Sequence, residues 1–346
     1  MKNLISKNQS IYVAGHKGMV GSAIIRTLRK NGYGDKRIGG KIITQTRHEL
    51  DLTDSSKVSD WFEENKPEVV VIAAAKVGGI SANNNYPFEF ISENLKIQQN
   101  IFSSAWRTKT KRLLFLGSSC IYPKESKQPI KEEYLLSGYL EPTNEPYALA
   151  KIAGIKTCDA LRKQYNFDAI SLMPTNMYGP GDNYHPDNSH VFASLARKFV
   201  YAKKTNQKIV TCWGNGESLR EFLHVDDFGE ACVHVLEKWN PDSNDAPKDE
   251  YGNKLNYLNV GSGLEISIKA LASHISKAVG YDGKIIWDQS FPNGTFRKKL
   301  DSSKIKSIGW SPKIGLREGI AMVTKEISYA YDNPREKLLK NLFFNN

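Results

Sequence analysis

Short apolar runs and longer amphipathic patterns alternate along the first half of the chain. The apolar runs have the length and Val/Ile/Leu content of buried strands, and they predict strands at about 10–14, 41–45, 68–74, 111–116 and 167–172. Helical periodicity between them predicts helices at about 22–29, 88–107 and 143–165. Strands that alternate with helices in this way predict an α/β fold built on a doubly wound parallel sheet.

The alternation weakens in the second half, which predicts a smaller C-terminal α/β domain. Strands are expected at about 208–212, 257–260 and 284–287, and helices at about 191–201, 226–238, 267–279 and 316–331. The polar stretch 240–254 is rich in Asp, Asn and Pro, which predicts a surface loop. We therefore expect one domain from 1–178 plus 222–250 and a second from 179–221 plus 251–346.

Charge narrows the class of ligand. The 346-residue chain carries a formal net charge of +11, which suits an anionic ligand such as a nucleotide, or nucleic acid. The basic residues are scattered and are not interleaved with aromatic residues. This distribution argues against nucleic acid and favours a small anionic ligand.

The cysteines and the apolar stretches indicate the compartment. Cys120, Cys158, Cys212 and Cys232 form no Cys-x-x-Cys pair and have no histidine cluster beside them, so neither disulfides nor a metal site is expected. No stretch approaches 18 apolar residues, and the N-terminus lacks the apolar run of a signal peptide. We expect a cytoplasmic protein that does not bind a membrane.

A glycine-rich segment joins the first predicted strand to the first predicted helix. It reads Gly15-His16-Lys17-Gly18-Met19-Val20-Gly21. Glycines in this context allow a tight turn and bring the helix N-terminus up to a pyrophosphate. The spacing differs by one residue from Gly-x-Gly-x-x-Gly, and an ordinary strand-to-helix turn is the alternative interpretation. We expect a Rossmann-like dinucleotide-binding domain.

The end of the second predicted strand distinguishes the two nicotinamide cofactors. Enzymes that use NAD place an acidic residue here for the ribose 2′-hydroxyl, but none stands at 43–47. Arg47 stands there instead, and Lys17 lies in the glycine segment. Two cations suit a 2′-phosphate, so the sequence favours NADP. The alternative is that Arg47 is only a solvated loop charge.

Candidate chemistry follows the fourth predicted strand. Ser118, Ser119 and Cys120 come directly after it, and Tyr147 and Lys151 lie one turn apart on the next helix. Parallel strands end at the same edge of a sheet, so these residues should meet there. An ammonium favours the phenolate form of a nearby Tyr, which can then protonate a carbonyl oxygen as hydride arrives. By itself a Tyr-x-x-x-Lys spacing also fits a surface pair.

Taken together, these motifs resemble the extended short-chain dehydrogenase/reductases and, more narrowly, the GDP-L-fucose synthase family. The resemblance spans about residues 10–330. Six blocks carry it, namely 15–23 (GHKGMVGSA), 73–80 (AAAKVGGI), 117–123 (GSSCIYP), 141–148 (EPTNEPYA), 173–176 (MPTN) and 220–227 (REFLHVDD).

The resemblance implies an NADPH-dependent reduction of the C4 ketone of GDP-4-keto-6-deoxy-mannose after epimerisation at C3 and C5. It implies that Ser118, Tyr147 and Lys151 are the reductase triad, with Tyr147 as the proton donor to the C4 oxygen. Cys120 and His190 would be the base and acid of the epimerisation. From the residues alone, Cys120 fits an inert small residue and His190 a polar loop residue.

Binding positions follow from the same resemblance. For the cofactor they are Gly15, His16, Lys17, Gly18, Met19, Val20, Gly21, Arg47, Asp51, Leu52, Ala74, Ala75, Lys76, Gly117, Ser118, Ser119, Tyr147, Lys151, Pro174, Thr175, Asn176, Met177 and His190. For the nucleotide sugar, which the second domain would hold, they are Ser119, Cys120, Asn176, Lys198, Trp213, Arg220, Asn293 and Lys298. The resemblance also implies a homodimer through helices 88–107 and 143–165.

Two departures from the family pattern leave the sugar open. Asn293 stands where the family usually has Asp, and Lys198 stands where Arg is common. Relatives that act on GDP-linked 4-keto heptoses in capsule or lipopolysaccharide synthesis offer one alternative. A pure C4 reductase without epimerase activity, an NAD-dependent nucleotide-sugar epimerase or dehydratase, and a nucleotide-binding regulatory protein are the others.

Overall fold

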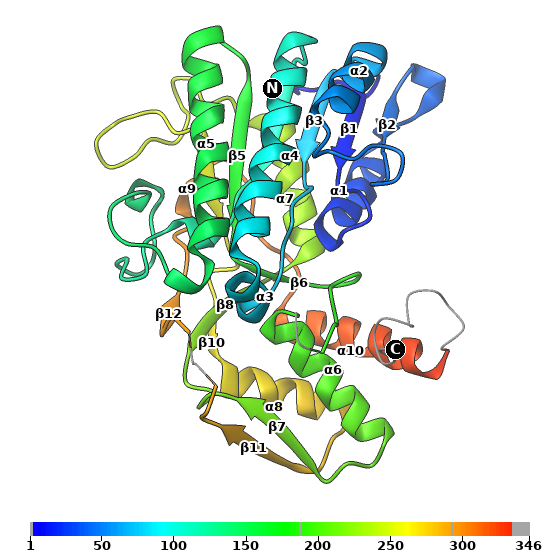
Figure 1. Cartoon of the computed structure of the whole chain (residues 1–346), viewed down its shortest axis with the longest axis vertical. Helices are drawn as coiled ribbons and strands as arrows, with labels where there is room; N and C mark the ends of the chain where they lie inside the picture. Colours follow the sequence, from blue (N-terminus) through cyan, green and yellow to red (C-terminus); the bar gives the residue numbers. More distant parts are fainter. Residues whose placement is uncertain (1–2, 187–188, 292–293, 334–346) are drawn as a thin grey trace.

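A six-stranded parallel sheet dominates the computed structural model, which describes residues 3–186, 189–291 and 294–333 (Figure 1). The strand order is β2-β1-β3-β4-β5-β9. These strands are β1 (Ser10–Ala14), β2 (Lys41–Ile43), β3 (Val69–Ile72), β4 (Arg112–Leu116), β5 (Ala169–Pro174) and β9 (Tyr257–Val260). The helices around them are α1 (Met19–Lys30), α2 (Ser55–Asn65), α3 (Ile80–Asn85), α4 (Pro87–Arg107), α5 (Glu145–Tyr165) and α7 (Val225–Lys238).

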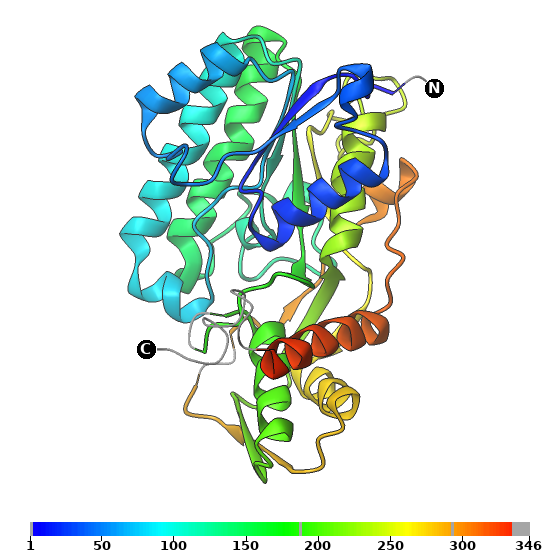
Figure 2. The ribbon, with the colours of Figure 1, turned by 90° about the vertical axis from the view of Figure 1, so that its right-hand side faces the viewer.

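Helices cover both faces of this sheet, and Figure 2 shows the sheet between the two layers. One apolar cluster packs α1 and α7 against one face, and a second packs α2, α4 and α5 against the other. Every residue of β3, β4 and β5 is buried, as expected of parallel strands covered on both sides. The predicted doubly wound parallel sheet is therefore confirmed.

A smaller second lobe faces the carboxyl ends of the large sheet (Figure 1). Its core is an apolar cluster contributed mainly by three helices. The further strands and helices are β6 (Asn176–Tyr178), α6 (Val191–Lys204), β7 (Ile209–Trp213), β8 (Leu219–His224), β10 (Glu265–Ser267), α8 (Ile268–Val279), β11 (Lys284–Asp288), β12 (Arg297–Lys298), α9 (Ser303–Ser307) and α10 (Leu316–Asp332). β8 pairs with β10, β12 and β6, whereas β7 pairs with β11.

β9 completes the large sheet from a part of the chain that was expected in the second domain. It pairs with β5 in parallel, with Ser171 opposite Tyr257 and Pro174 opposite Val260. The strand joins this sheet because its four residues are all buried and fill the remaining edge of β5. The division into 1–178 plus 222–250 and 179–221 plus 251–346 stays a prediction, and this pairing would move β9 to the first part.

Several of the described elements were not expected from the sequence, among them α2 and β8. Asp54 begins α2 by accepting a 3.1 Å hydrogen bond from the backbone N–H of Lys57, and only Val58 and Phe62 of this helix are buried. β8 contains the adjacent charges Arg220 and Glu221, which obscure the pattern of a buried strand.

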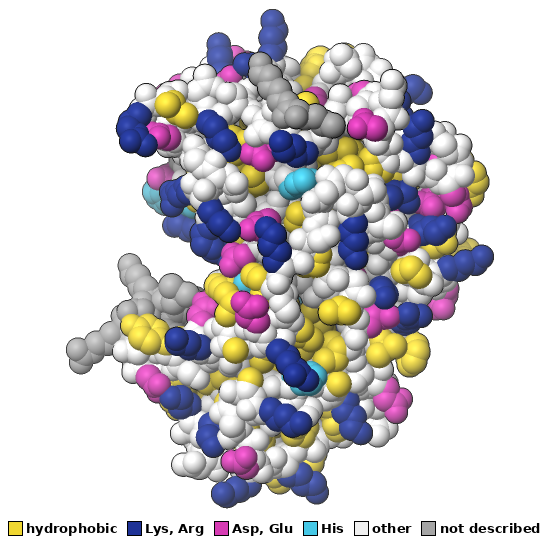
Figure 3. Space-filling view, turned by 180° about the vertical axis from the view of Figure 1, so that it is seen from behind, with side chains coloured by type: hydrophobic (Ala, Val, Ile, Leu, Met, Phe, Trp, Pro, Cys, Tyr) yellow, Lys and Arg dark blue, Asp and Glu magenta, His cyan; other side chains and the backbone are white. Residues whose placement is uncertain are grey.

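Charged side chains are spread over the surface seen in Figure 3, with Lys and Arg interspersed among Asp and Glu. The formal charge of +11 is therefore not gathered into one basic patch on this face. Among the described residues, no helix combines the length and hydropathy that a membrane crossing requires.

Candidate active site

The glycine segment forms a tight turn at the carboxyl end of β1. Gly15 has φ +83°, and a Cβ there would lie 2.6 Å from the backbone nitrogen of Ala74. A Cβ on Gly21 would lie 2.2 Å from the Gly15 carbonyl oxygen. Only glycine permits this packing of backbone on backbone. Gly18 begins α1 without a side-chain cap, so the first N–H groups of a twelve-residue helix are available to an anion.

Basic residues follow both β1 and β2, with His16 and Lys17 in the glycine turn and Arg47 beyond β2. The Arg47 side chain is 75% exposed, and its Nε lies 3.7 Å from the Asp51 carboxylate. Hydrogen bonds from Thr46 lower the pKa of Glu49, and the nearby charges of Lys17 and His16 lower it further. The predicted partners Arg47 and Lys17 therefore lie on the same side of the nucleotide turn.

Helix α5 brings Tyr147 and Lys151 to the carboxyl end of β4. Pro146 lies in its first turn, where the missing N–H is tolerated. Gly154 allows a close approach, since a Cβ there would lie 2.3 Å from the Phe115 ring. Lys151 is 4% exposed, and its Nζ donates a 2.8 Å hydrogen bond to the Leu116 carbonyl.

Ser118, Tyr147 and Lys151 form one group, as the sequence predicted. The Ser118 hydroxyl lies near enough to Tyr147 to lower the pKa of the phenol, and Lys151 Nζ lies 5.8 Å from the Tyr147 ring centroid. Burial and the nearby Cys120 raise the pKa of Tyr147, and the Ser118 hydroxyl partly opposes this rise. Burial lowers the pKa of Lys151 to about 8. The Tyr147 phenol can thus donate a proton, and the neighbouring Lys151 ammonium loses its own proton more readily because it is buried.

The buried Lys151 ammonium should make stability depend on pH. Its pKa is about 8 in the folded chain, against 10.5 ordinarily. Between these values the native state releases a proton that the unfolded state keeps, so the free energy of unfolding rises with pH. Relative to Lys151→Met, the wild type should gain about 3 kcal/mol from pH 8 to 10.5 in urea titrations. This gain is absent below pH 8 and complete above 10.5.

The matched control is Lys156→Met on the same helix. Lys156 is half-exposed and pairs with Asp159 at 3.1 Å, so its removal should change stability by the same small amount at every pH. If the free energy of unfolding changed with pH in the same way for the wild type and Lys151→Met, the lowered pKa of Lys151 would be contradicted.

Cys120 lies in a 3₁₀ turn, Ser119–Ile121, beside this group. Its backbone N–H donates to Ser118 Oγ at 3.2 Å. Two side chains donate to its sulfur, Asn144 Nδ2 at 3.4 Å and Lys298 Nζ at 3.5 Å. These two donors lie far apart in the sequence. The sulfur opens on a small pocket lined by Tyr122, Pro123, Lys124, Gln128, Ile130, Glu141, Asn144, Thr295, Arg297 and Lys298.

His190 occupies the N-cap position of α6 in the second lobe, without a capping hydrogen bond from its side chain. Its side chain reaches solvent, yet the surrounding protein removes enough hydration to lower its pKa. The imidazole of the ligand-free chain is therefore largely neutral at pH 7. Its pairing with Cys120 across one substrate stays a prediction.

Three predicted substrate residues lie on the strands and helices of the second lobe. Lys198 Nζ donates to the Thr211 carbonyl at 2.9 Å and lies 5.0 Å from the Trp213 ring. Burial lowers the pKa of Lys198 and of Arg220. Arg220 also lies near Cys120. Trp213 stacks on Phe291 with centroids 4.3 Å apart.

The remaining predicted positions line the ends of the central strands. Gly117 allows β4 to approach Met173, since a Cβ would lie 2.4 Å from its sulfur. Thr175 and Asn176 both donate to the Glu221 carbonyl, at 3.2 and 3.0 Å. Lys76 pairs with Glu93 on α4 at 2.6 Å. Ser119 and Thr175 are buried, Ala74 and Ala75 follow β3, Pro174 ends β5, Met177 lies within β6, and Leu52 lies in the segment between β2 and α2. Asn293 lies outside the described residues.

Sequence reasoning missed Asn144 and Glu221. Asn144 lies in the 141–148 block but carries no pattern that points to the sulfur of Cys120. Glu221 is fully buried, and its carboxylate accepts from the backbone N–H of Gly263 at 2.6 Å and of Leu300 at 3.0 Å. It thereby fixes two loops beside Arg220, an arrangement that only the folded chain reveals.

Comparison with known proteins agrees with this geometry. The model of the NAD dependent epimerase/dehydratase family matches residues 11–248. The chain is 50% identical to GDP-L-fucose synthase 1 of Arabidopsis thaliana over 93% of its length and 94% of the relative. It is 48% identical to GDP-L-fucose synthase of Escherichia coli, over 90% and 94%.

Solved structures agree as well. A GDP-mannoheptose C4 reductase from Campylobacter jejuni with NADP bound superposes with a TM-score of 0.80 at 34% identity, covering 93% of this chain and 98% of that one. The chain therefore belongs to the NAD dependent epimerase/dehydratase family and, within it, groups with the GDP-L-fucose synthases.

Proposed function

We propose that this protein reduces the C4 ketone of a GDP-linked 4-keto-6-deoxy hexose with NADPH, after epimerising C3 and C5. The observation that carries the proposal is the meeting of two sets of groups at one sheet edge. Ser118, Tyr147 and Lys151 form a reductase-type set, and Cys120 with its two donors lies directly beside them. The relatives at 48–50% identity bear the name GDP-L-fucose synthase.

The nucleotide turn fits a dinucleotide with a 2′-phosphate. The backbone contacts of Gly15 and Gly21 leave a surface without side chains at the N-terminus of α1, as a pyrophosphate requires. Arg47, Lys17 and His16 would hold the extra phosphate. When bound there, NADPH supplies the hydride for C4.

In the reduction step, the protein supplies the proton and the positioning. Tyr147 donates its phenolic proton to the C4 oxygen, and Ser118 holds that oxygen beside it. Lys151 stabilises the phenolate that remains. Burial of the group excludes water that would otherwise screen these charges.

In the epimerisation steps, Cys120 acts as base. Its sulfur removes the proton on the carbon next to the ketone, and the C–H electron pair moves into an enolate. The Lys298 ammonium and the Asn144 amide donate hydrogen bonds to this sulfur and hold it in place. His190 returns a proton to the other face. The anionic substrate favours the charged imidazole that this step needs.

Arg47 should decide the preference for NADPH. Arg47→Ala should raise the Kd for NADPH about 30-fold, because a charge-assisted bond to phosphate is lost. The Kd for NADH should change little. Both are measured by titration of cofactor fluorescence. Arg37→Ala is the control, since this exposed arginine pairs only locally with Asp35. An equal loss for both cofactors would show that Arg47 does not contact the 2′-phosphate.

A homodimer and a cytoplasmic location complete the proposal. α4 and α5 pack side by side and expose large apolar side chains, namely Phe88, Leu95, Trp106, Leu149 and Tyr165. Such a stripe on two adjacent helices suits contact with a second copy. Light scattering that returns the 38.9 kDa of one chain would contradict the dimer.

The four cysteines are free, which suits a reducing compartment such as the cytoplasm.

One reaction tests the function. GDP-4-keto-6-deoxy-mannose and NADPH are incubated with the enzyme in deuterated water, and the product is read by NMR. We expect NADPH oxidation and deuterium at C3 and C5. Turnover without deuterium would leave a pure C4 reductase. No turnover would favour a GDP-linked 4-keto heptose, for which the structural relative from Campylobacter jejuni gives the precedent.

A further inference from the structure

A buried polar cluster connects the turn of Cys120 to the edge of the large sheet. Its centre is Asn259 on β9, which has no exposed surface. Asn259 Oδ1 accepts a 2.6 Å hydrogen bond from the Tyr122 hydroxyl, and Nδ2 donates to the Ile130 carbonyl at 2.9 Å. Tyr122 follows the turn Ser119–Ile121 directly. The amide of Asn259 thus holds one end of the segment that carries Cys120.

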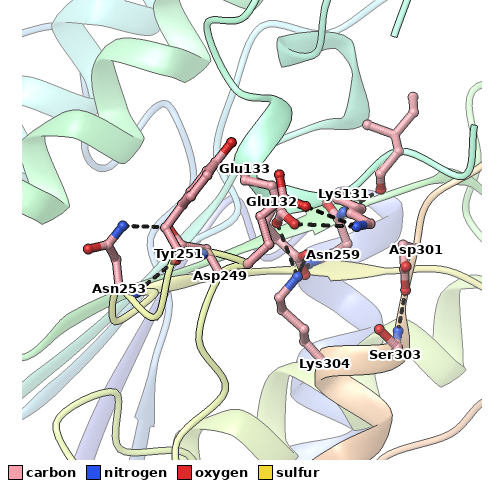
Figure 4. Close-up of polar contacts among 12 residues, drawn as sticks. Lys131, Glu132, Glu133, Asp249, Tyr251, Asn253, Asn259, Asp301, Ser303 and Lys304 are labelled. Carbon is pink, nitrogen blue, oxygen red and sulfur yellow. Dashed lines mark hydrogen bonds and ion pairs between the residues drawn. The ribbon is translucent and has the colours of Figure 1, made fainter. Parts of the chain in front are cut away.

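A buried carboxylate fixes Asn259 in turn. The backbone N–H of Asn259 donates to Glu132 Oε1 at 2.9 Å, and Lys304 Nζ on α9 donates to Glu132 Oε2 at 2.9 Å. Figure 4 shows Glu132 between these partners, with Glu133 also reaching Lys304. Glu132 has no exposed surface. A charge buried this deeply persists only where its partners are fixed.

The same cluster also holds the segment that carries Lys298. The Ile130 N–H donates to the Lys299 carbonyl at 2.8 Å, and the Asp301 N–H donates to the Ile130 carbonyl at 2.8 Å. Lys298 directly precedes this pairing and places its Nζ 3.5 Å from Cys120 Sγ. Asn259 therefore contacts both a neighbour of Cys120 and the residue that positions Lys298.

We infer that Asn259, supported by Glu132 and Tyr122, positions Cys120 and Lys298 against each other. The hydrogen bonds that define the cluster involve neither Tyr147 nor Lys151, the groups of the proposed reduction step. Its catalytic consequence rests on the proposed function. Loss of the cluster should slow the epimerisation selectively, because only the base and its cation are displaced.

Tyr122→Phe tests the inference with one atom removed. We expect deuterium exchange at C3 and C5 to fall about tenfold, since a displaced base loses its alignment with the C–H bond. Oxidation of GDP-L-fucose by NADP⁺ runs the C4 step backwards without prior epimerisation, and its rate should stay close to that of the wild type.

Tyr257→Phe is the matched control. Tyr257 lies on β9 in the same cluster, but its hydroxyl donates at 3.2 Å to the Glu132 carbonyl and not to the Asn259 side chain. Exchange should remain close to wild type in this variant. A loss of exchange equal to that of Tyr122→Phe, or an equal loss of C4 oxidation in Tyr122→Phe, would mean general destabilisation and overturn the inference.

A measurement without substrate keeps the inference separate from the proposed function. Iodoacetamide should alkylate Cys120 about threefold more slowly in Tyr122→Phe than in Tyr257→Phe at pH 7, because the sulfur moves away from the Lys298 ammonium. Intact mass reports this reaction, since Cys158, Cys212 and Cys232 are buried. If the wild type shows no exchange at C3 and C5, the proposed epimerase activity is wrong. The alkylation rates alone then test whether the cluster positions Cys120. Equal rates would overturn the positioning role.

Discussion

Tyr147→Phe should lower the rate of C4 reduction by on the order of 10³-fold, because the variant has no proton to give the developing alkoxide. Ser118 keeps its hydroxyl, and Lys151 keeps its bond to the Leu116 carbonyl. The apolar contacts of the ring, including that with Phe90, are preserved by phenylalanine. Binding of NADPH should therefore stay close to that of the wild type.

The measurement is single-turnover NADPH oxidation, followed together with deuterium exchange at C3 and C5. Exchange should persist in Tyr147→Phe, because Cys120 and its donors are unchanged. Tyr165→Phe at the end of the same helix is the control, since its ring packs against Trp106 at a tilt and far from the reacting groups. If Tyr147→Phe reduced C4 within tenfold of the wild-type rate, a group other than Tyr147 would be the proton donor.

Cys120→Ser should abolish exchange at C3 and C5, with a loss on the order of 10³-fold. A serine hydroxyl holds its proton far more tightly than a thiol does, and the donation from Lys298 cannot make it a base at neutral pH. Net NADPH oxidation from GDP-4-keto-6-deoxy-mannose should fall with it. Oxidation of GDP-L-fucose by NADP⁺ should survive, because that direction begins at C4.

Cys158→Ser controls for the substitution itself. Cys158 is buried on α5 beside Ser171, which can bond a new hydroxyl. Exchange that survives Cys120→Ser at more than a tenth of the wild-type rate would remove this cysteine from the mechanism. His190 would then need a different partner.

Much of the fold follows from local patterns. The apolar runs of β1, β3, β4 and β5 are continuous because helices cover both faces of these strands, and such runs stand out in the sequence. The parallel topology then brings Ser118 to the same edge as Tyr147 and Lys151. The meeting of these three residues was predictable for that reason.

Other features depend on contacts that no local pattern encodes. Lys298 reaches Cys120 only because the segment after β12 pairs with Ile130. Glu221 interrupts the apolar pattern of β8, and the loops that satisfy its carboxylate lie far along the chain. α2 buries two residues, which leaves a weak helical pattern. These features had to be read from the structure.

The return of the chain to form β9 bears on how the protein folds during synthesis. A nascent chain that has emerged only as far as β5 has an unpaired edge on its largest sheet, and that edge is covered only after β6, α6, β7 and β8 of the second lobe have been translated. Contacts this distant in sequence slow folding and leave an exposed strand in the meantime. The two lobes are thus expected to mature together, with neither acting as an independent folding unit.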